Sequence, residues 1–302
     1  MELKIVKIGK KSRDFGALDV SDSCSLKDLK SKFQKLHNVS YHRQSYKLRN
    51  GDDLKPLMDD MKPLKSMGVQ NGSELVFKDL GPQIGYRTVF ILEYLGPLLI
   101  VLLYSYRPWW IYGDQSNQKY FNNTARLGII CWNTHFIKRE LETLFVHRFS
   151  HATMPMFNLF KNCAYYWCFG AAIGYPLCHP LYQSPSNQLQ IQFGLLVFLL
   201  SEILNLAVHL QLRSLRPKDG SHARPIPKGP LFALVSCPNY TFEVMGWIGF
   251  CILTQIFYSY VFTLMGLLQM TQWALKKHRN YIKTYGTEYK ILRRRAIIPL
   301  VL

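Results

Sequence analysis

The pattern of polar and apolar positions divides the chain into two parts. In the first part, MELKIVKI at the N-terminus alternates polar and apolar residues, as a half-buried strand does. From Arg87 onward, long apolar runs rich in Phe, Tyr and Trp alternate with short basic segments. We therefore expect a small soluble domain over residues 1–80 and a helical membrane bundle over residues 81–302.

The N-terminal part predicts a compact α+β domain. GALDVSDSCSLKDLKSKFQKLHN runs a second strand into a helix that is capped at Ser25 or a neighbour, with Leu26, Leu29 and Phe33 on one face. YKLRN and ELVFKDL read as further strands, each close to an Asn-Gly turn signal. The order strand, strand, helix, strands is that of a ubiquitin-like (β-grasp) domain, and another small α+β fold is the alternative.

The apolar runs predict membrane spans, because about 20 consecutive apolar residues are needed to cross a bilayer as a helix. Residues 87–106 and 188–212 meet this requirement, whereas charged side chains interrupt 126–147 and 161–180. Residues 230–275 are long enough for two spans with a tight connection. The sequence therefore predicts about six spans.

The charge of the chain does not change the predicted elements, but it indicates which partners the chain binds. The net charge is +18 and the mean hydropathy is −0.03. The basic residues gather between the apolar runs and at the C-terminus, which is typical of cytosolic loops beside membrane lipid and not of a nucleic-acid-binding stripe. With six spans, both termini are expected in the cytosol. The seven cysteines are scattered without a CxxC motif, which predicts free thiols.

Polar groups inside predicted spans are the first candidates for chemistry, because charge at membrane depth is costly and usually functional. Glu93 lies in the first span. Asn205, His209 and Arg213 follow at i, i+4 and i+8 on one helical stripe, and Arg216 adds a second guanidinium that could hold phosphates. The alternatives are a helix–helix hydrogen bond for Glu93 and an anchor in lipid headgroups for the arginines.

A second group of candidates lies in the segment CPNYTFE. Pro238 is expected to break the local helix, which is tolerated at membrane depth where backbone lines a cavity. Asn239, Tyr240 and Glu243 then present an amide, a phenol and a carboxylate within one short segment. We therefore expect this segment to form part of a binding or catalytic site.

Two further pairs involve histidine. His278 and Tyr281 share a helical face in the basic tail, which predicts a packed segment; a tail attracted to anionic lipid is the alternative. His147 and His151 are spaced i, i+4, but without an HExxH motif or an obvious third ligand we expect no metal. No GxGxxG or Walker A motif appears, so a nucleotide cofactor would bind within the bundle.

Several segments resemble the trans-2,3-enoyl-CoA reductases of the endoplasmic reticulum, in the steroid 5α-reductase superfamily: KRELETLFVHRFSHATMP, KNCAYYW, HPLY, LVSCPNYTFEV, KKHRNY and IIPLVL. The resemblance covers nearly the whole chain. It implies a very-long-chain enoyl-CoA reductase, an oxidoreductase acting on CH–CH donors, that uses NADPH to reduce long-chain and very-long-chain trans-2-enoyl-CoA. This is the last step of fatty acid elongation and also serves sphingolipid metabolism. The resemblance further implies a multi-pass protein of the endoplasmic reticulum membrane that works with other elongation enzymes.

The resemblance also implies roles for particular residues. Tyr240 matches the proposed proton donor, and Glu93 matches a glutamate that supports it. The cofactor-binding positions are matched by Asn205, Arg213, Arg216, Asn239, Glu243, His278 and Tyr281. Two other functions stay open: a steroid or sterol double-bond reductase with the same cofactor pocket, and a non-catalytic scaffold of the elongation complex.

Overall fold

The computed structural model describes residues 1–7, 13–118, 120–149, 152–216 and 225–301. These residues form two compact units. One contains Met1–Tyr86 and a short strand near residue 154, and the other contains the long helices. Each unit is described by itself.

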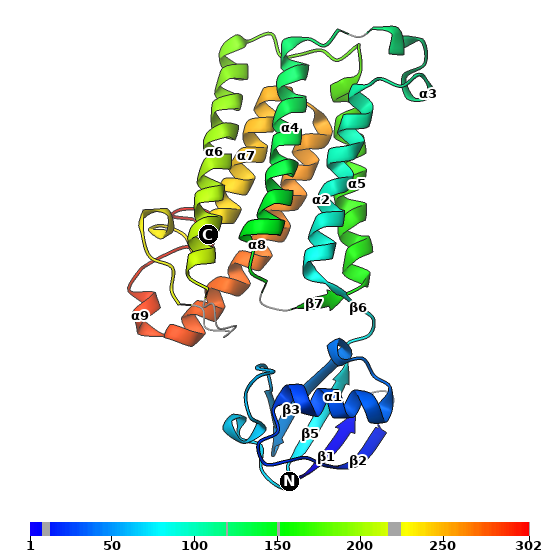
Figure 1. The fold of residues 1–302 in the computed structure, drawn as a ribbon. Coiled ribbons are helices and arrows are strands. Elements are labelled where there is room, and N and C mark those ends of the chain that lie inside the picture. The colour runs from blue at the N-terminus through cyan, green and yellow to red at the C-terminus, as the bar shows by residue number, and fades with distance from the viewer. Residues whose placement is uncertain (8–12, 119, 150–151, 217–224, 302) are drawn as a thin grey trace. The chain divides into compact units, whose positions relative to one another are not determined.

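The N-terminal unit is a five-stranded sheet crossed by one helix (Figure 1). The strand order is β2-β1-β5-β3-β4, with β1 parallel to β5 and the other neighbours antiparallel. This arrangement is consistent with the β-grasp order expected from the sequence. The elements are β1 (Glu2–Lys7), β2 (Arg13–Asp19), α1 (Leu26–His37), η1 (Tyr41–Arg43), β3 (Gln44–Asn50), β4 (Asp53–Pro56), η2 (Leu64–Met67) and β5 (Glu74–Asp79).

Helix α1 is set by its cap and by one apolar face. The Ser25 hydroxyl accepts from the Asp28 amide at 3.2 Å, and the Asp28 carboxylate accepts from the Ser25 amide at 3.0 Å. This reciprocal cap satisfies backbone donors that a helix start leaves open. Leu26, Leu29 and Phe33 are fully buried in the core of the unit, which confirms the predicted helical face.

A two-stranded ribbon completes this unit. Strand β6 (Gln83–Gly85) pairs antiparallel with β7 (Thr153–Pro155), although almost 70 residues separate them in sequence. The ribbon therefore connects the approach to the first long helix with the approach to the third.

The second unit is a bundle of long helices that run side by side (Figure 1). Their positions agree with the apolar runs. The elements are α2 (Tyr86–Ser105), α3 (Trp109–Tyr112), η3 (Gly113–Asn117), α4 (Asn123–Leu141), the π-helix η4 (Glu142–Val146), α5 (Phe157–Cys178), α6 (Gln188–Ser214), η5 (Pro230–Phe232), α7 (Pro238–Thr254), α8 (Phe257–Tyr285) and α9 (Thr287–Lys290).

Among the helices that the structure describes, α2 and α6 are long and apolar enough to cross a membrane. The predicted number of six spans is not confirmed. Helix α7 has 17 residues, fewer than the roughly 20 that a straight span needs. Helix α4 carries Lys138 and Arg139 inside its apolar run.

Helices α6 and α7 touch through their backbones. A Cβ atom at Gly194 would lie 2.6 Å from the Leu253 backbone nitrogen, and one at Gly249 would lie 2.6 Å from the Phe198 nitrogen. Only glycine allows this approach. The contact fixes the two helices that carry most of the candidate site residues.

The start of α7 is held by the C-terminal tail. The Ser236 amide donates to the Arg295 carbonyl at 2.8 Å, and the Thr241 hydroxyl donates to the Ile297 carbonyl at 2.6 Å. Pro238 occupies the first turn of α7, where its missing N–H costs nothing. The proline therefore begins a helix and does not interrupt one.

Candidate active site

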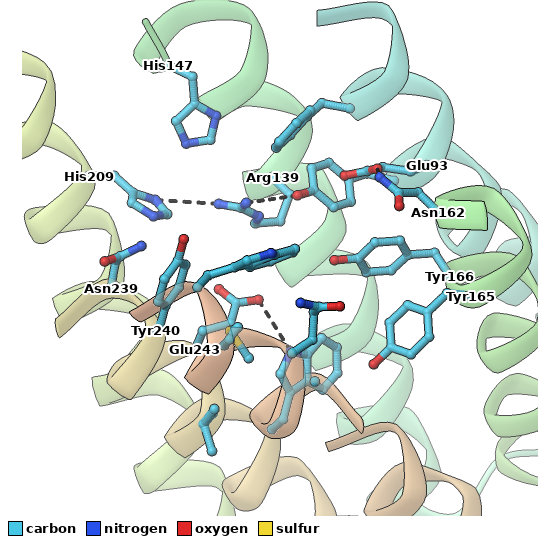
Figure 2. Close-up of a pocket in the computed structure, with 18 of the residues that line it drawn as sticks. Glu93, Arg139, His147, Asn162, Tyr165, Tyr166, His209, Asn239, Tyr240 and Glu243 are labelled. Atoms are coloured by element: carbon cyan, nitrogen blue, oxygen red, sulfur yellow. Dashed lines mark hydrogen bonds between the residues drawn. The ribbon is translucent and has the colours of Figure 1, made fainter. Parts of the chain in front are cut away.

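A cavity of about 720 Å³ lies inside the helical unit. Side chains from α2, α4, α5, α6, α7 and α8 line it (Figure 2). Its volume is in the range of sites that hold drug-sized ligands or cofactors. Six of the candidate residues line this cavity: Glu93, Arg213, Arg216, Asn239, Tyr240 and Glu243.

Asn205 lies directly behind the cavity wall and supports two of these residues. Its side chain is 1% exposed, and its Nδ2 donates to the Asn239 carbonyl at 2.8 Å and to Glu243 Oε2 at 3.3 Å. Asn205 thus connects α6 to the first turns of α7. It holds the wall and does not face the cavity.

Tyr240 presents its phenol from α7. The centroids of the Tyr240 and Trp273 rings lie 6.1 Å apart, and Lys277 Nζ lies 5.1 Å from the Tyr240 centroid. Among the described residues, the Tyr240 hydroxyl has no hydrogen-bond partner. Its proton is therefore available to a ligand in the cavity.

Glu93 lies on another wall of the cavity. It is 3% exposed, and its Oε2 accepts from Asn162 Nδ2 at 2.8 Å. Figure 2 shows Glu93 beside Asn162 on one side and Tyr240 on the other. Among the described residues, Glu93 and Tyr240 are not hydrogen-bonded to each other. The structure therefore does not show Glu93 holding the Tyr240 phenol directly, as the resemblance implied.

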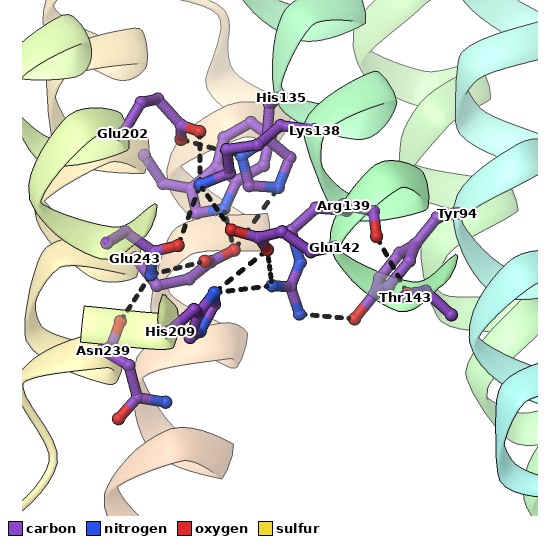
Figure 3. A network of polar contacts seen from close by, with 12 residues as sticks. Tyr94, His135, Lys138, Arg139, Glu142, Thr143, Glu202, His209, Asn239 and Glu243 are labelled. Carbon is purple, nitrogen blue, oxygen red and sulfur yellow. Dashed lines mark hydrogen bonds and ion pairs between the residues drawn. The ribbon is translucent and has the colours of Figure 1, made fainter. Parts of the chain in front are cut away.

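A buried guanidinium lies at the centre of the polar wall (Figure 3). Arg139 Nη1 lies 2.6 Å from Glu142 Oε2, and Arg139 Nη2 donates to the Tyr94 hydroxyl at 2.9 Å. Glu142 is 1% exposed and its Oε2 also lies 3.0 Å from His209 Nδ1. The Tyr94 hydroxyl therefore joins this network, and it also hydrogen-bonds the Glu93 carboxyl.

A second ionic group lies behind this wall (Figure 3). Lys138 Nζ lies 2.7 Å from Glu202 Oε2 and donates to Asn205 Oδ1 at 2.8 Å. His135 Nδ1 lies 2.8 Å from Glu202 Oε1, and its Nε2 lies 3.4 Å from Glu243 Oε1. The group joins α4, α6 and α7, and satisfies charges that would be costly alone in the interior.

Sequence reasoning missed several of these residues: Tyr94, His135, Lys138, Arg139, Glu142, Asn162 and Glu202. Lys138 and Arg139 are among the basic side chains that interrupt the apolar run 126–147, and sequence reasoning assigned them no role at a site. The available signal was their spacing of three and four residues from Glu142, which places opposite charges on one helical face.

His147 lies with Glu142 and His209, and candidate ligand atoms of the three lie within 4.8 Å of one another. The Arg139 guanidinium pairs with Glu142 at this place and already supplies a cation. The arrangement is therefore an ion-pair network that includes arginine. His151, the other member of the predicted pair, lies outside the described residues.

His278 and Tyr281 lie outside the described lining of the cavity and connect α8 to the tail. His278 Nδ1 lies 2.7 Å from the Ser236 hydroxyl and 3.1 Å from the Tyr289 hydroxyl. The Tyr281 ring stacks on Tyr289 with centroids 5.2 Å apart. These contacts hold the C-terminal segment in place.

Positive charge gathers at one end of the cavity. The cationic lining residues there are Arg148, Lys161, Arg213, Arg216 and Lys277. They lie near the start of α5, near the ends of η4 and α6, and in the second half of α8. The start of α5 and the ends of α6 and α8 lie at the same end of the bundle (Figure 1). Arg148 Nη1 donates to the Arg216 carbonyl at 2.7 Å, which ties two of the segments together. The cavity therefore has a cationic end that suits phosphates.

Comparison with known proteins gives consistent matches. The sequence profile of the 3-oxo-5-alpha-steroid 4-dehydrogenase family matches residues 152–302. A putative enoyl-CoA reductase of Trypanosoma brucei brucei is 46% identical over 291 residues, covering 94% of this chain and 96% of the relative. A very-long-chain enoyl-CoA reductase of Dictyostelium discoideum is 41% identical over 310 residues, the full length of both. A probable very-long-chain enoyl-CoA reductase of Caenorhabditis elegans is 42% identical over 292 residues, covering 94% of this chain and 93% of the relative.

Proposed function

The chain belongs to the family of very-long-chain enoyl-CoA reductases, and from this premise we propose that it reduces trans-2-enoyl-CoA to the saturated acyl-CoA with NADPH. The observation that carries the proposal is the cavity, which combines a cationic end with the phenol of Tyr240. The proposal extends to the last step of very-long-chain fatty acid elongation, to sphingolipid metabolism and to work beside other elongation enzymes.

The residues present fit a nicotinamide dinucleotide phosphate. Asn239 Oδ1 is buried on the cavity side and has no protein partner among the described residues, so it can accept from a ligand amide or hydroxyl. Arg213 and Arg216 would pair with phosphate oxygens through their guanidinium forks. Glu243 would complete the wall, held by Asn205. When bound, the cofactor supplies a hydride.

His278 and Tyr281 enter the proposal differently from the other cofactor-binding candidates. Both fix α8 against the C-terminal tail through Ser236 and Tyr289. Their role would be to hold the helix that carries Lys277 at the cationic end. We therefore propose indirect support of cofactor binding for these two residues.

The reaction adds a hydride to the β-carbon of the enoyl thioester and a proton to its α-carbon, which turns the double bond into a single bond. Tyr240 is proposed as the proton donor, because its phenol lines the cavity and has no hydrogen-bond partner among the described residues. Charge develops on the thioester oxygen during hydride addition and needs donors. Arg139, which lines the cavity beside Tyr94, would supply a donor there.

Glu93 is proposed to act from the substrate wall. Its carboxylate is held by Asn162, and both residues line the cavity. In this position the pair would orient the thioester between the cofactor and Tyr240. Orientation of reacting groups is a large part of enzymatic rate enhancement.

Localisation is part of the same proposal. The family is membrane-associated, and α2 and α6 are apolar enough to span a bilayer. We propose a multi-pass protein of the endoplasmic reticulum membrane with both termini in the cytosol. A cytosolic cationic end would then meet water-soluble NADPH and the CoA moiety of the substrate.

A steroid double-bond reductase is the second candidate, because the matching family profile is described by a steroid substrate. The test is NADPH oxidation by purified protein with trans-2-enoyl-CoA substrates and with unsaturated 3-oxo steroids. Consumption of NADPH with enoyl-CoA alone would support the proposal. Consumption with steroids alone would replace it by the second candidate, and a protein that binds NADPH but consumes none would favour a scaffold.

A further inference from the structure

The cavity has a mouth along two helices of the bundle. Exposed lining residues mark its long edges: Lys161, Ala164 and Cys168 on α5, and Met265 and Trp273 on α8. One more exposed lining residue, Arg213 on α6, lies at the cationic end. Met265 is 46% exposed and Trp273 is 52% exposed. The α5 residues are spaced three and four apart, so they form one continuous edge. The mouth is therefore a slit between α5 and α8.

Aromatic side chains close one end of the slit. The Tyr165 and Phe262 rings stack with centroids 5.2 Å apart, and the Tyr165 hydroxyl donates to the Phe262 carbonyl at 2.9 Å. The Phe169 and Phe262 centroids lie 5.4 Å apart. Figure 2 shows Tyr165 and Tyr166 on the side of the cavity opposite Tyr240 and Asn239. These contacts join α5 to α8 and close this end of the slit, which we call the Tyr165–Phe262 stop.

The wall of the slit changes character along α8. Phe262, Gly266 and Met270 line its apolar part, and Lys277 lines the cationic end. Phe262 and Trp273 are roughly 16 Å apart along the axis at 1.5 Å per residue. The slit therefore matches a molecule with an anionic head and a long apolar tail.

We propose that this slit holds the acyl chain of the substrate, which enters sideways from lipid between α5 and α8 and extends along Gly266 toward the Tyr165–Phe262 stop. The cationic end identifies the occupant, because it suits the CoA phosphates at the head of the same molecule. The inference rests on the proposed enoyl-CoA reduction. It adds the two helices that admit the chain and the residues that set chain-length preference.

Gly266 is the position at which the slit can be narrowed with least disturbance. A Cβ there would lie 3.4 Å from the Tyr165 hydroxyl oxygen and 3.6 Å from Met270 Cε, which are ordinary contacts. Alanine therefore fits, whereas leucine would extend into the slit. Replacing a helical glycine by either residue also favours the helix.

The test measures kcat/KM of the purified full chain, in lipid nanodiscs, with trans-2-enoyl-CoA substrates from butenoyl to very-long-chain. In Gly266→Leu, the ratio of kcat/KM for very-long-chain substrate to that for butenoyl-CoA should fall about tenfold or more. Gly266→Ala should give a smaller fall. Leu264→Phe is the matched control, because Leu264 lies on the same helix, is 56% exposed and is not among the described lining residues.

An unchanged ratio in Gly266→Leu would overturn the slit as the acyl site while leaving enoyl-CoA reduction by the wild type intact. Absence of any enoyl-CoA reduction by the wild type would remove the proposed function and this inference together. The same fall in Leu264→Phe would also overturn it, because that outcome would assign the effect to general damage.

A second measurement does not depend on folding of a variant. Cys168 is exposed on the α5 edge of the slit, so its alkylation by a maleimide can be followed by mass spectrometry. Very-long-chain enoyl-CoA should slow alkylation at least about tenfold, and CoA alone should not. Equal protection by phospholipid alone, or no protection by the substrate, would overturn the proposal.

Discussion

The two units of this chain treat charge in opposite ways. In the N-terminal unit the core cluster is apolar, and the Arg49–Glu74 ion pair, at 2.6 Å, joins two partly exposed side chains. In the helical unit, Glu142 is 1% exposed and pairs with Arg139 at the centre of the bundle. The buried charges of the helical unit lie beside the cavity, whose lining includes Arg139, Glu243 and His209. They point to chemistry at the cavity.

The largest expected effect is the loss of turnover in Tyr240→Phe, a substitution in the helical unit. Loss of the proton donor should lower turnover of trans-2-enoyl-CoA on the order of 10²- to 10⁴-fold. Binding of NADPH, followed by its fluorescence, should be unchanged. Tyr258→Phe is a matched control, because Tyr258 is 48% exposed on α8 and lies outside the described lining. A Tyr240→Phe protein with near wild-type turnover would show that another group donates the proton.

Glu142→Gln tests the contrast between buried and exposed ion pairs directly. Removing one partner of a buried pair typically costs about 3–5 kcal/mol, because the other charge is left uncompensated. The matched change Glu74→Gln, at the surface pair with Arg49, should cost less than about 1 kcal/mol. Denaturant unfolding of each unit, followed by hydrogen exchange, gives both values. Equal losses of unfolding free energy in Glu142→Gln and Glu74→Gln would contradict the contrast between buried and exposed ion pairs.

Arg213→Ala should weaken cofactor binding without unfolding the bundle. A hydrogen bond to a charged group contributes about 1.5–3 kcal/mol, so KM for NADPH should rise roughly tenfold to hundredfold. Arg213→Lys should recover part of the loss, since lysine keeps the charge but not the fork. Arg49→Ala, which removes a cation from the β-grasp unit, should leave this KM unchanged. A rise in KM in both variants would mean that net charge alone matters.

The smallest expected effect is a pH dependence confined to the β-grasp unit. Hydrogen bonds from Arg43 hold the pKa of Asp79 below its usual value. The pair therefore stabilises the unit above the unfolded pKa of about 3.9, and this contribution is lost as the pH falls through the lower folded value. It should be below about 1 kcal/mol, because both side chains are partly exposed. Urea unfolding of the unit, followed by hydrogen exchange from neutral pH to pH ~3, should show an acid-dependent loss in the wild type that is reduced in Arg43→Ala.

The sequence predicted the strands and the helix of the N-terminal unit because their signals are local. Ser25 and Asp28 form the predicted start of a helix, and Leu26, Leu29 and Phe33 are spaced for one buried face. The site was predicted only in part. Periodicity could place its residues on helices but not decide which helices face one another.

Tyr94 and Asn162 illustrate the part that could not be predicted. Each looks ordinary within its own apolar run, and becomes informative only through Arg139 and Glu93, 45 and 69 residues away. His278 shows the converse, because its helical face predicted a packed segment, and the structure places it against Ser236 before the start of α7. The cofactor contact that the resemblance implied for His278 stays a prediction. In each of these cases the role of the residue depends on a contact with a residue far away in the sequence.

The glycine contact between α6 and α7 has a mechanical consequence. The backbones of the two helices touch at Gly194 and Gly249, so neither helix can shift or rotate against the other without a steric clash. The two helices therefore move as one rigid pair, and most of the proposed cofactor-binding residues lie on it. We therefore expect the cavity to open for a ligand on the other side, where the described contacts between α5 and α8 come from side chains such as Tyr165, which can change rotamer.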